Sequence, residues 1–152
     1  MLKVAIVMGS ASDNKISDKV EDIFKEFGVE YETHVMSAHR NPIKVKKFIG
    51  NLENNGFGAV IAIAGLAAHL PGVCASLTTL PVIGVPGDGG PLNGQDALYS
   101  IVQMPKGIPV ACVGIGNGAN AGLLAVQILA TADQSLKTKM KEYRKKFGDD
   151  VE

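Results

Sequence analysis

Residues 2–13 read LKVAIVMGSASD, and this stretch decides the fold. It opens on a continuous apolar run, Leu2–Met8, which is rich in branched residues and ends at a glycine. A run of this kind is typical of a strand buried on both faces, as in a parallel sheet. Ser12 and Asp13, which follow the glycine, favour the start of a helix. The stretch therefore predicts a buried strand, a tight turn and a helix.

The same alternation continues along the chain and predicts an α/β protein. Strands that alternate with helices form a parallel sheet covered on both sides, a three-layer α/β sandwich. Five strands favour the flavodoxin-like order 2-1-3-4-5. We predict one domain, 1–152, because no linker or repeat divides it. The further strands are expected at 29–36, 57–64, 81–85 and 108–113, and the helices after the first at 42–52, 66–77 (interrupted at Pro71-Gly72), 95–103, 119–131 and 134–147.

Composition limits the class of function. Lys and Arg together number 15, as do Asp and Glu, so the basic surface that nucleic acid requires is not evident. No apolar run is long enough to span a membrane without a Gly or Pro interruption, and the N-terminal run lacks a signal peptide's features. Cys74 and Cys112 lie far apart in apolar stretches, which predicts buried thiols in a reducing compartment. We expect a cytoplasmic protein without nucleic-acid or membrane partners.

Polar residues follow the first strand at the edge where parallel sheets bind ligands. Ser10, Ser12 and Asp13 would meet the free amides of a helix N-terminus, which is a ready anion site. Asp13 is better suited to accept hydrogen bonds from sugar hydroxyls than to face a phosphate. The alternative is that Ser12 and Asp13 only cap the helix.

The second strand is followed by Ser37, Ala38, His39 and Arg40. Arginine binds phosphate oxygens through two parallel hydrogen bonds, and histidine transfers protons near neutral pH. We expect this turn and the first one to converge on one cavity. The sequence therefore predicts a site for a phosphorylated heterocycle, with His39 as the proton-transfer group. Neither the histidines and cysteines nor any Gly-x-Ser-x-Gly motif indicates a metal ion or a nucleophile.

Two later loops are expected at the same edge. Small residues around Gly65 would let a planar ring lie against the backbone, with Leu66 and Leu70 beside it. For His69, a buried structural role and substrate contact are equally supported. The glycine-rich segment 87–94 is a candidate lid.

The helix at 119–130 is apolar on almost every face. A helix of this kind is buried on every face, and a chain this small cannot cover it alone. The helix therefore predicts a homo-oligomer.

Six segments in this order resemble the class I PurE proteins of purine biosynthesis, over nearly the whole chain. The most specific are Ser-Ala-His-Arg at 37–40 and Ile-Val-Gln-Met-Pro at 101–105. The others lie at 8–13, 67–72, 80–86 and 120–125.

The resemblance implies a flavodoxin-like fold and an N5-carboxyaminoimidazole ribonucleotide mutase, an isomerase that uses no metal, cofactor or ATP. The carboxylate of the substrate would move from the exocyclic nitrogen to a ring carbon through carbon dioxide, with His39 shuttling a proton. The resemblance also implies an octamer, in which the helix 134–147 packs on a neighbouring subunit. Substrate-binding roles are implied for Ser10, Ser12, Asp13, Ser37, Ala38, Arg40, Gly65, Leu66, His69 and Leu70.

The chain departs from the family pattern at three places. Ile63 and Leu66 stand where the family has glycine. The segment 87–91 differs from the family's and contains an additional acid, Asp88, and Ala97 stands where the family has serine. Three alternatives remain open: a direct carboxylase of aminoimidazole ribonucleotide, a carboxylase of a related pyridine nucleotide, and a flavodoxin-like nucleotide-binding module without activity.

Overall fold

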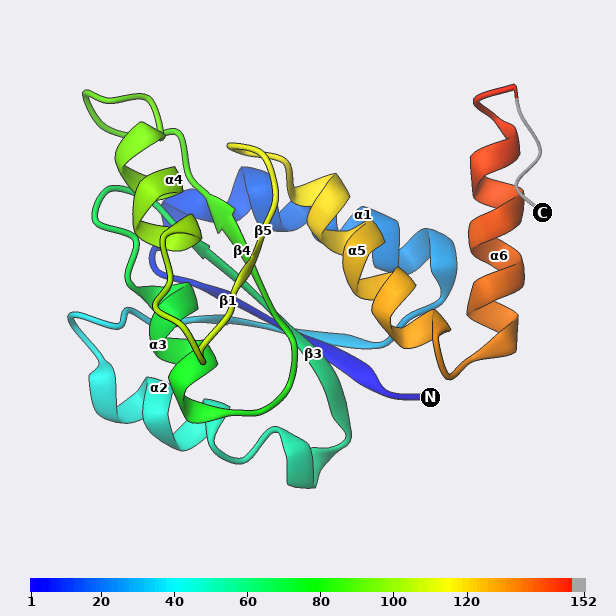
Figure 1. The fold of residues 1–152 in the computed structure, drawn as a ribbon, viewed down its shortest axis with the longest axis horizontal. Coiled ribbons are helices and arrows are strands. Elements are labelled where there is room, and N and C mark those ends of the chain that lie inside the picture. The colour runs from blue at the N-terminus through cyan, green and yellow to red at the C-terminus, as the bar shows by residue number, and fades with distance from the viewer. Residues whose placement is uncertain (149–152) are drawn as a thin grey trace.

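The five strands form one parallel sheet in the order β2-β1-β3-β4-β5, as predicted (Figure 1). The computed structural model describes residues 1–148. Because β1 lies inside the sheet with both faces covered, five of its six residues are buried. β2 lies at the edge and is only half-buried, in keeping with the mixture of polar and apolar residues in its sequence. The strands are β1 (Lys3–Met8), β2 (Tyr31–Val35), β3 (Phe57–Ala64), β4 (Val82–Pro86) and β5 (Ala111–Cys112).

Helices cover both faces of the sheet, which confirms the three-layer prediction (Figure 1). α1 (Asn14–Phe27) and α5 (Gly118–Ala130) cover one face. The other face carries α2 (Pro42–Ile49), α3 (Leu70–Leu77) and α4 (Gln95–Val102). α6 (Gln134–Lys145) lies outside α5, and short 3₁₀ turns form η1 (Ala11–Asp13) and η2 (Glu53–Asn55).

The two faces of β1 separate the core into two clusters. Val4 and Ile6 point toward α1 and α5, whereas Ala5 and Val7 point toward the opposite helices. This alternation follows from the two-residue period of a strand. The sheet is therefore anchored on both sides, and its strand ends are held at fixed positions.

Two predicted elements differ substantially from the structure, and the helix expected at 42–52 ends three residues early, at Ile49. The helix expected at 66–77 begins at Leu70, and Pro71 does not interrupt it because proline is tolerated in the first helical turn. The strand expected at 108–113 is reduced to Ala111–Cys112. Gly107 takes a left-handed conformation (φ 104°) and Pro109 has no N–H to donate, so strand pairing starts only beyond them.

α6 packs against its own chain along one face. Leu136 is fully buried, Lys139 Nζ donates to the carbonyl oxygen of Phe27 at 2.8 Å, and the rings of Tyr143 and Phe27 lie 5.4 Å apart. The structure therefore shows what one face of this helix contacts. Packing of the predicted helix 134–147 on a neighbouring subunit stays a prediction.

The two cysteines differ in burial. Cys74 is buried, and the loss of solvation raises the pKa of its thiol to about 12. Cys112 is half-buried, with a pKa that burial also raises, so the expectation of two buried thiols is correct only for Cys74. Among residues 1–148, no helix combines the length and the apolar character needed to cross a membrane.

Candidate active site at the carboxyl ends of the strands

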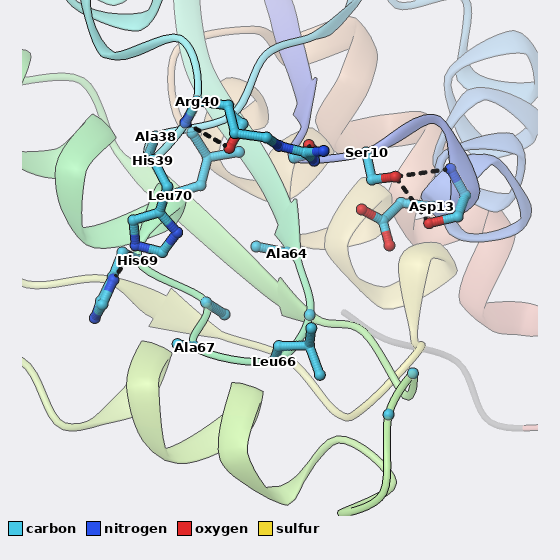
Figure 2. Close-up of a pocket in the computed structure, with 17 residues that line it drawn as sticks. Ser10, Asp13, Ala38, His39, Arg40, Ala64, Leu66, Ala67, His69 and Leu70 are labelled. Atoms are coloured by element: carbon cyan, nitrogen blue, oxygen red, sulfur yellow. Dashed lines mark hydrogen bonds between the residues drawn. The ribbon is translucent and has the colours of Figure 1, made fainter.

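A cavity of about 660 Å³ lies where the first four strands end (Figure 2). All eleven residues predicted for the site line it: Ser10, Ser12, Asp13, Ser37, Ala38, His39, Arg40, Gly65, Leu66, His69 and Leu70. The turns after β1 and β2 thus share one cavity. Prediction from sequence did not single out Gly9 and Ala64, which also line it. Their position directly at a strand end was the available signal.

Ser10, not Ser12 or Asp13, caps the turn after β1. Ser10 Oγ accepts hydrogen bonds from the backbone N–H of Ser12 at 3.3 Å and from Ser12 Oγ at 3.0 Å. Asp13 precedes α1 but makes no side-chain capping bond. The alternative in which Ser12 and Asp13 only cap the helix is therefore wrong. The Asp13 carboxylate faces the cavity instead (Figure 2).

Burial raises the pKa of the Asp13 carboxyl above its ordinary value, and the nearby charge of Asp88 raises it further. A backbone hydrogen bond at Ser10 acts in the opposite direction. Asp88 belongs to the loop between β4 and α4, which also brings Gly89 and Gly90 to the cavity. The site thus contains a carboxylate whose charge is costly until a polar ligand donates hydrogen bonds to it.

Asp13→Asn is expected to raise the melting temperature at pH 7. A carboxyl whose pKa is raised by folding stabilises the fold in its protonated form, below its ordinary value of 3.8. That stabilisation is lost as the pH rises through the pKa of the folded protein, because the carboxyl then ionises. Asparagine does not ionise, so the variant does not lose stability in this way. The difference in melting temperature between Asp13→Asn and the wild type should therefore shrink as the pH falls from 7 to 3.5. Thermal melts across this range, with the exposed Asp18→Asn as control, measure it; a less stable Asp13→Asn protein at pH 7 would contradict the assignment.

The turn after β2 is closed by three hydrogen bonds. Ser37 Oγ accepts a hydrogen bond from the backbone N–H of Arg40 at 3.1 Å. The Ser37 carbonyl oxygen accepts one from the backbone N–H of Asn41 at 2.8 Å. Asn41 Oδ1 accepts from the Ser37 N–H at 3.3 Å. Arg40 Nη2 reaches across to the carbonyl oxygen of Gly9 at 3.2 Å. The two turns are therefore joined directly, and a guanidinium lies beside the Ser10 turn.

Two histidines face each other at the other side of the cavity (Figure 2). His39 Nε2 is hydrogen-bonded to His69 Nδ1, and the two rings are nearly perpendicular, with centroids 4.6 Å apart. Both residues are exposed to the cavity, so the buried structural role considered for His69 is wrong. Because this hydrogen bond occupies Nε2 of His39, Nδ1 is the nitrogen of His39 that remains free for a ligand.

Leu66 lies in the loop between β3 and α3 with a left-handed backbone, φ 54°. This conformation costs a leucine about 1–2 kcal/mol, whereas glycine adopts it freely. The loop is held by the hydrogen bond from Ala68 N–H to the carbonyl oxygen of Leu66 at 2.9 Å. It also approaches the next loop closely, because a Cβ added to Gly87 would lie 3.3 Å from the Cα of Gly65. A strained leucine at a site residue indicates a functional constraint.

The cavity combines anion-binding groups at one side with a pair of proton carriers at the other. Hydroxyls, a guanidinium and the N-terminus of α1 meet at the first side, which suits a phosphorylated sugar. Within the described part of the chain, no three His, Cys, Asp or Glu residues gather as metal ligands. Fold and site together define a flavodoxin-like α/β protein with a nucleotide-sized cavity at the strand ends.

The family model described as AIR carboxylase matches residues 3–150, so the chain belongs to the AIR carboxylase family. Similar curated proteins are the N5-carboxyaminoimidazole ribonucleotide mutases of Methanocaldococcus jannaschii (57% identity; 95% of this chain and 89% of the relative) and Escherichia coli K12 (49%; 98% and 89%). A solved PurE structure from Treponema denticola superimposes with a TM-score of 0.88 at 30% identity, covering 97% of this chain and 92% of that one.

Proposed function

We propose that this protein is an N5-carboxyaminoimidazole ribonucleotide mutase of purine biosynthesis. The observation that carries the proposal is the shared cavity, in which the turn of Ser10 and Asp13 faces His39 and His69. Family membership and relatives at about 50% identity over the full chain support it. The reaction isomerises a nucleotide, so it needs no second substrate.

Each side of the cavity has its own role in the proposal. Ser10 and Arg40 bind the phosphate, and Asp13 accepts hydrogen bonds from the ribose hydroxyls. Ligand hydroxyls then compensate for the burial that raises the pKa of the Asp13 carboxyl. Ser37 and Ala38, with the loop of Gly65, Leu66 and Leu70, surround the base and its carboxylate.

The chemistry balances without a co-reactant. The bond between the exocyclic nitrogen and the carboxylate carbon breaks, carbon dioxide is released, and the nitrogen keeps the electron pair and gains a proton. The ring carbon then attacks carbon dioxide and loses its own proton. His39 gives and takes these protons, and its hydrogen bond to His69 Nδ1 orients the ring. A closed cavity keeps carbon dioxide beside the ring carbon.

Substrate comparison separates the mutase from a direct carboxylase. In buffer without ATP, the protein is expected to convert N5-carboxyaminoimidazole ribonucleotide into 4-carboxy-5-aminoimidazole ribonucleotide, followed by product absorbance. Aminoimidazole ribonucleotide with bicarbonate should react far more slowly at equal nucleotide concentration. Faster reaction of aminoimidazole ribonucleotide would establish the carboxylase, and no product from either nucleotide would refute both.

We also propose that the protein is a homo-oligomer, by analogy with the family an octamer, and that it is cytoplasmic. Support comes from the apolar surface of α5 that its own chain leaves half-exposed, at Leu123, Leu124 and Ile128. A groove of about 700 Å³ runs between α5 and α6, and exposed Phe147 lines it together with Leu123 and Leu124. Burial of this surface against a second copy would remove it from water.

A further inference from the structure

Asn41 stands at the N-terminus of α2 but does not cap this helix. An asparagine in this position ordinarily accepts a hydrogen bond from a backbone N–H of the first helical turn. The Asn41 side chain makes no such bond, and Pro42, the first residue of α2, has no N–H to donate. The first turn of α2 is therefore left without a side-chain cap, although a suitable residue precedes it.

The Asn41 side chain turns back toward the active-site cavity instead. Its Oδ1 accepts a hydrogen bond from the backbone N–H of Ser37 at 3.3 Å, and its own backbone N–H donates to the Ser37 carbonyl oxygen at 2.8 Å. Two reciprocal hydrogen bonds thus join residues 37 and 41. Between them lie only Ala38, His39 and Arg40, all of which line the cavity (Figure 2).

Asn117, at the N-terminus of α5, shows the ordinary arrangement. Its Oδ1 accepts a hydrogen bond from the backbone N–H of Asn120, three residues further along, at 3.0 Å. Asn41 and Asn117 hold the same position relative to their helices, yet only Asn117 caps its own helix. A local rule that is broken beside a site indicates that the residue serves the site. Asn41 therefore acts on the turn before α2.

We propose that Asn41 is a positioning residue of the mutase reaction, which closes the turn that carries His39 and Arg40 and so fixes the two in one geometry. This inference rests on the proposed function. His39 and Arg40 are neighbours in the chain but act at opposite sides of the cavity, one on the base and one on the phosphate. A turn that opens at Ser37 would change the orientation of one group relative to the other. Substrate held by Arg40 would then meet the His39 imidazole less often in the reactive position.

Asn41→Ala tests this role because it removes the Oδ1 acceptor and keeps the backbone hydrogen bond. We expect kcat to fall by about five-fold or more, and the affinity for 4-carboxy-5-aminoimidazole ribonucleotide to fall with it, since the turn holds a group for each. His39→Asn, in contrast, should lower kcat alone. Asn41→Asp keeps an acceptor oxygen of the same reach and should recover most of the lost kcat.

Hydrogen exchange gives a readout that does not depend on catalysis. The backbone N–H of Ser37 should exchange faster in Asn41→Ala than in the wild type, and at the wild-type rate in Asn41→Asp. The amides of the first turn of α2 should exchange at the same rate in all three proteins, because Asn41 does not cap this helix. Mass spectrometry of peptides that cover residues 37–45 measures both sets of amides.

Asn117→Ala is the matched control. Loss of its cap should lower the melting temperature by about 2–4 °C. It should leave the kcat of the folded protein unchanged, since Asn117 does not line the cavity. Asn41→Ala should show the reverse, a lower kcat with a smaller change in melting temperature.

Two results would overturn the proposal and leave the mutase intact. One is wild-type kcat and product affinity in Asn41→Ala. The other is a melting temperature that falls as far in Asn41→Ala as in Asn117→Ala while Ser37 exchanges as in the wild type, which would make Asn41 an ordinary helix cap. A wild-type protein that forms no carboxylated product would instead refute the mutase.

Discussion

His39→Asn is expected to lower kcat for the mutase reaction by about 10²–10⁴-fold, the usual contribution of a positioned general acid–base group. Asparagine retains a polar side chain of similar reach but exchanges no proton near neutral pH. Affinity for the product nucleotide should change little, because the phosphate and ribose groups lie at the other side of the cavity. Steady-state kinetics and product titration measure the two quantities separately.

His34→Asn is the control for this substitution. His34 lies on the edge strand β2, is paired with Glu32 at 3.2 Å, and does not line the active-site cavity. Its replacement should leave kcat within about two-fold, as expected of a surface position. Equal activity of His39→Asn and the wild type would remove His39 from the chemistry, whatever the fate of the substrate assignment.

Gly118→Ala is expected to destabilise the fold by about 3 kcal/mol, at the upper end for an added methyl group in a packed core. A Cβ at this first residue of α5 would lie 2.2 Å from the carbonyl oxygen of Ile16 in α1. The obstacle is backbone, so relief requires the two helices to separate. Gly122, one turn further along, meets Ile23 closely too, at 3.0 Å. Urea unfolding gives the free energy directly, and the melting temperature should fall by roughly 10 °C.

Gly114→Ala provides the comparison for Gly118. Gly114 is exposed, has no positive φ, and a Cβ there would meet only Asn117 Cβ, at an ordinary 3.8 Å. Its replacement should leave stability almost unchanged or slightly raised, because alanine restricts the unfolded chain. If both alanine variants were equally stable, α5 would not pack against α1 as closely as the structure has it.

The sheet and the position of the site were predictable because they follow from local patterns and one topological rule. Continuous apolar runs mark buried parallel strands, and their carboxyl ends meet at one edge. Ser10, Asp13, His39 and Arg40 each lie within five residues of the carboxyl end of a strand, so the rule places them together without any knowledge of contacts. The alternation of strands and helices likewise determined the sheet order.

The details that give the site its properties depend on contacts between distant residues. His39 meets His69 only because α3 begins at Leu70, four residues later than its apolar pattern indicates. The left-handed conformation of Leu66 contradicts its own preference, so no local rule predicts it. The raised pKa of Asp13 depends on its burial and on the charge of Asp88, which lies more than seventy positions away along the chain. Tertiary packing decides all three.

A crystal structure of the protein with bound 4-carboxy-5-aminoimidazole ribonucleotide tests most directly whether the turns after β1 and β2 form one substrate site. We expect the phosphate beside Ser10 and Arg40, the ribose hydroxyls on Asp13, and the ring carboxylate within reach of the His39 imidazole. A nucleotide bound anywhere else, such as the groove between α5 and α6, or bound in the cavity with His39 turned away from it, would contradict the account.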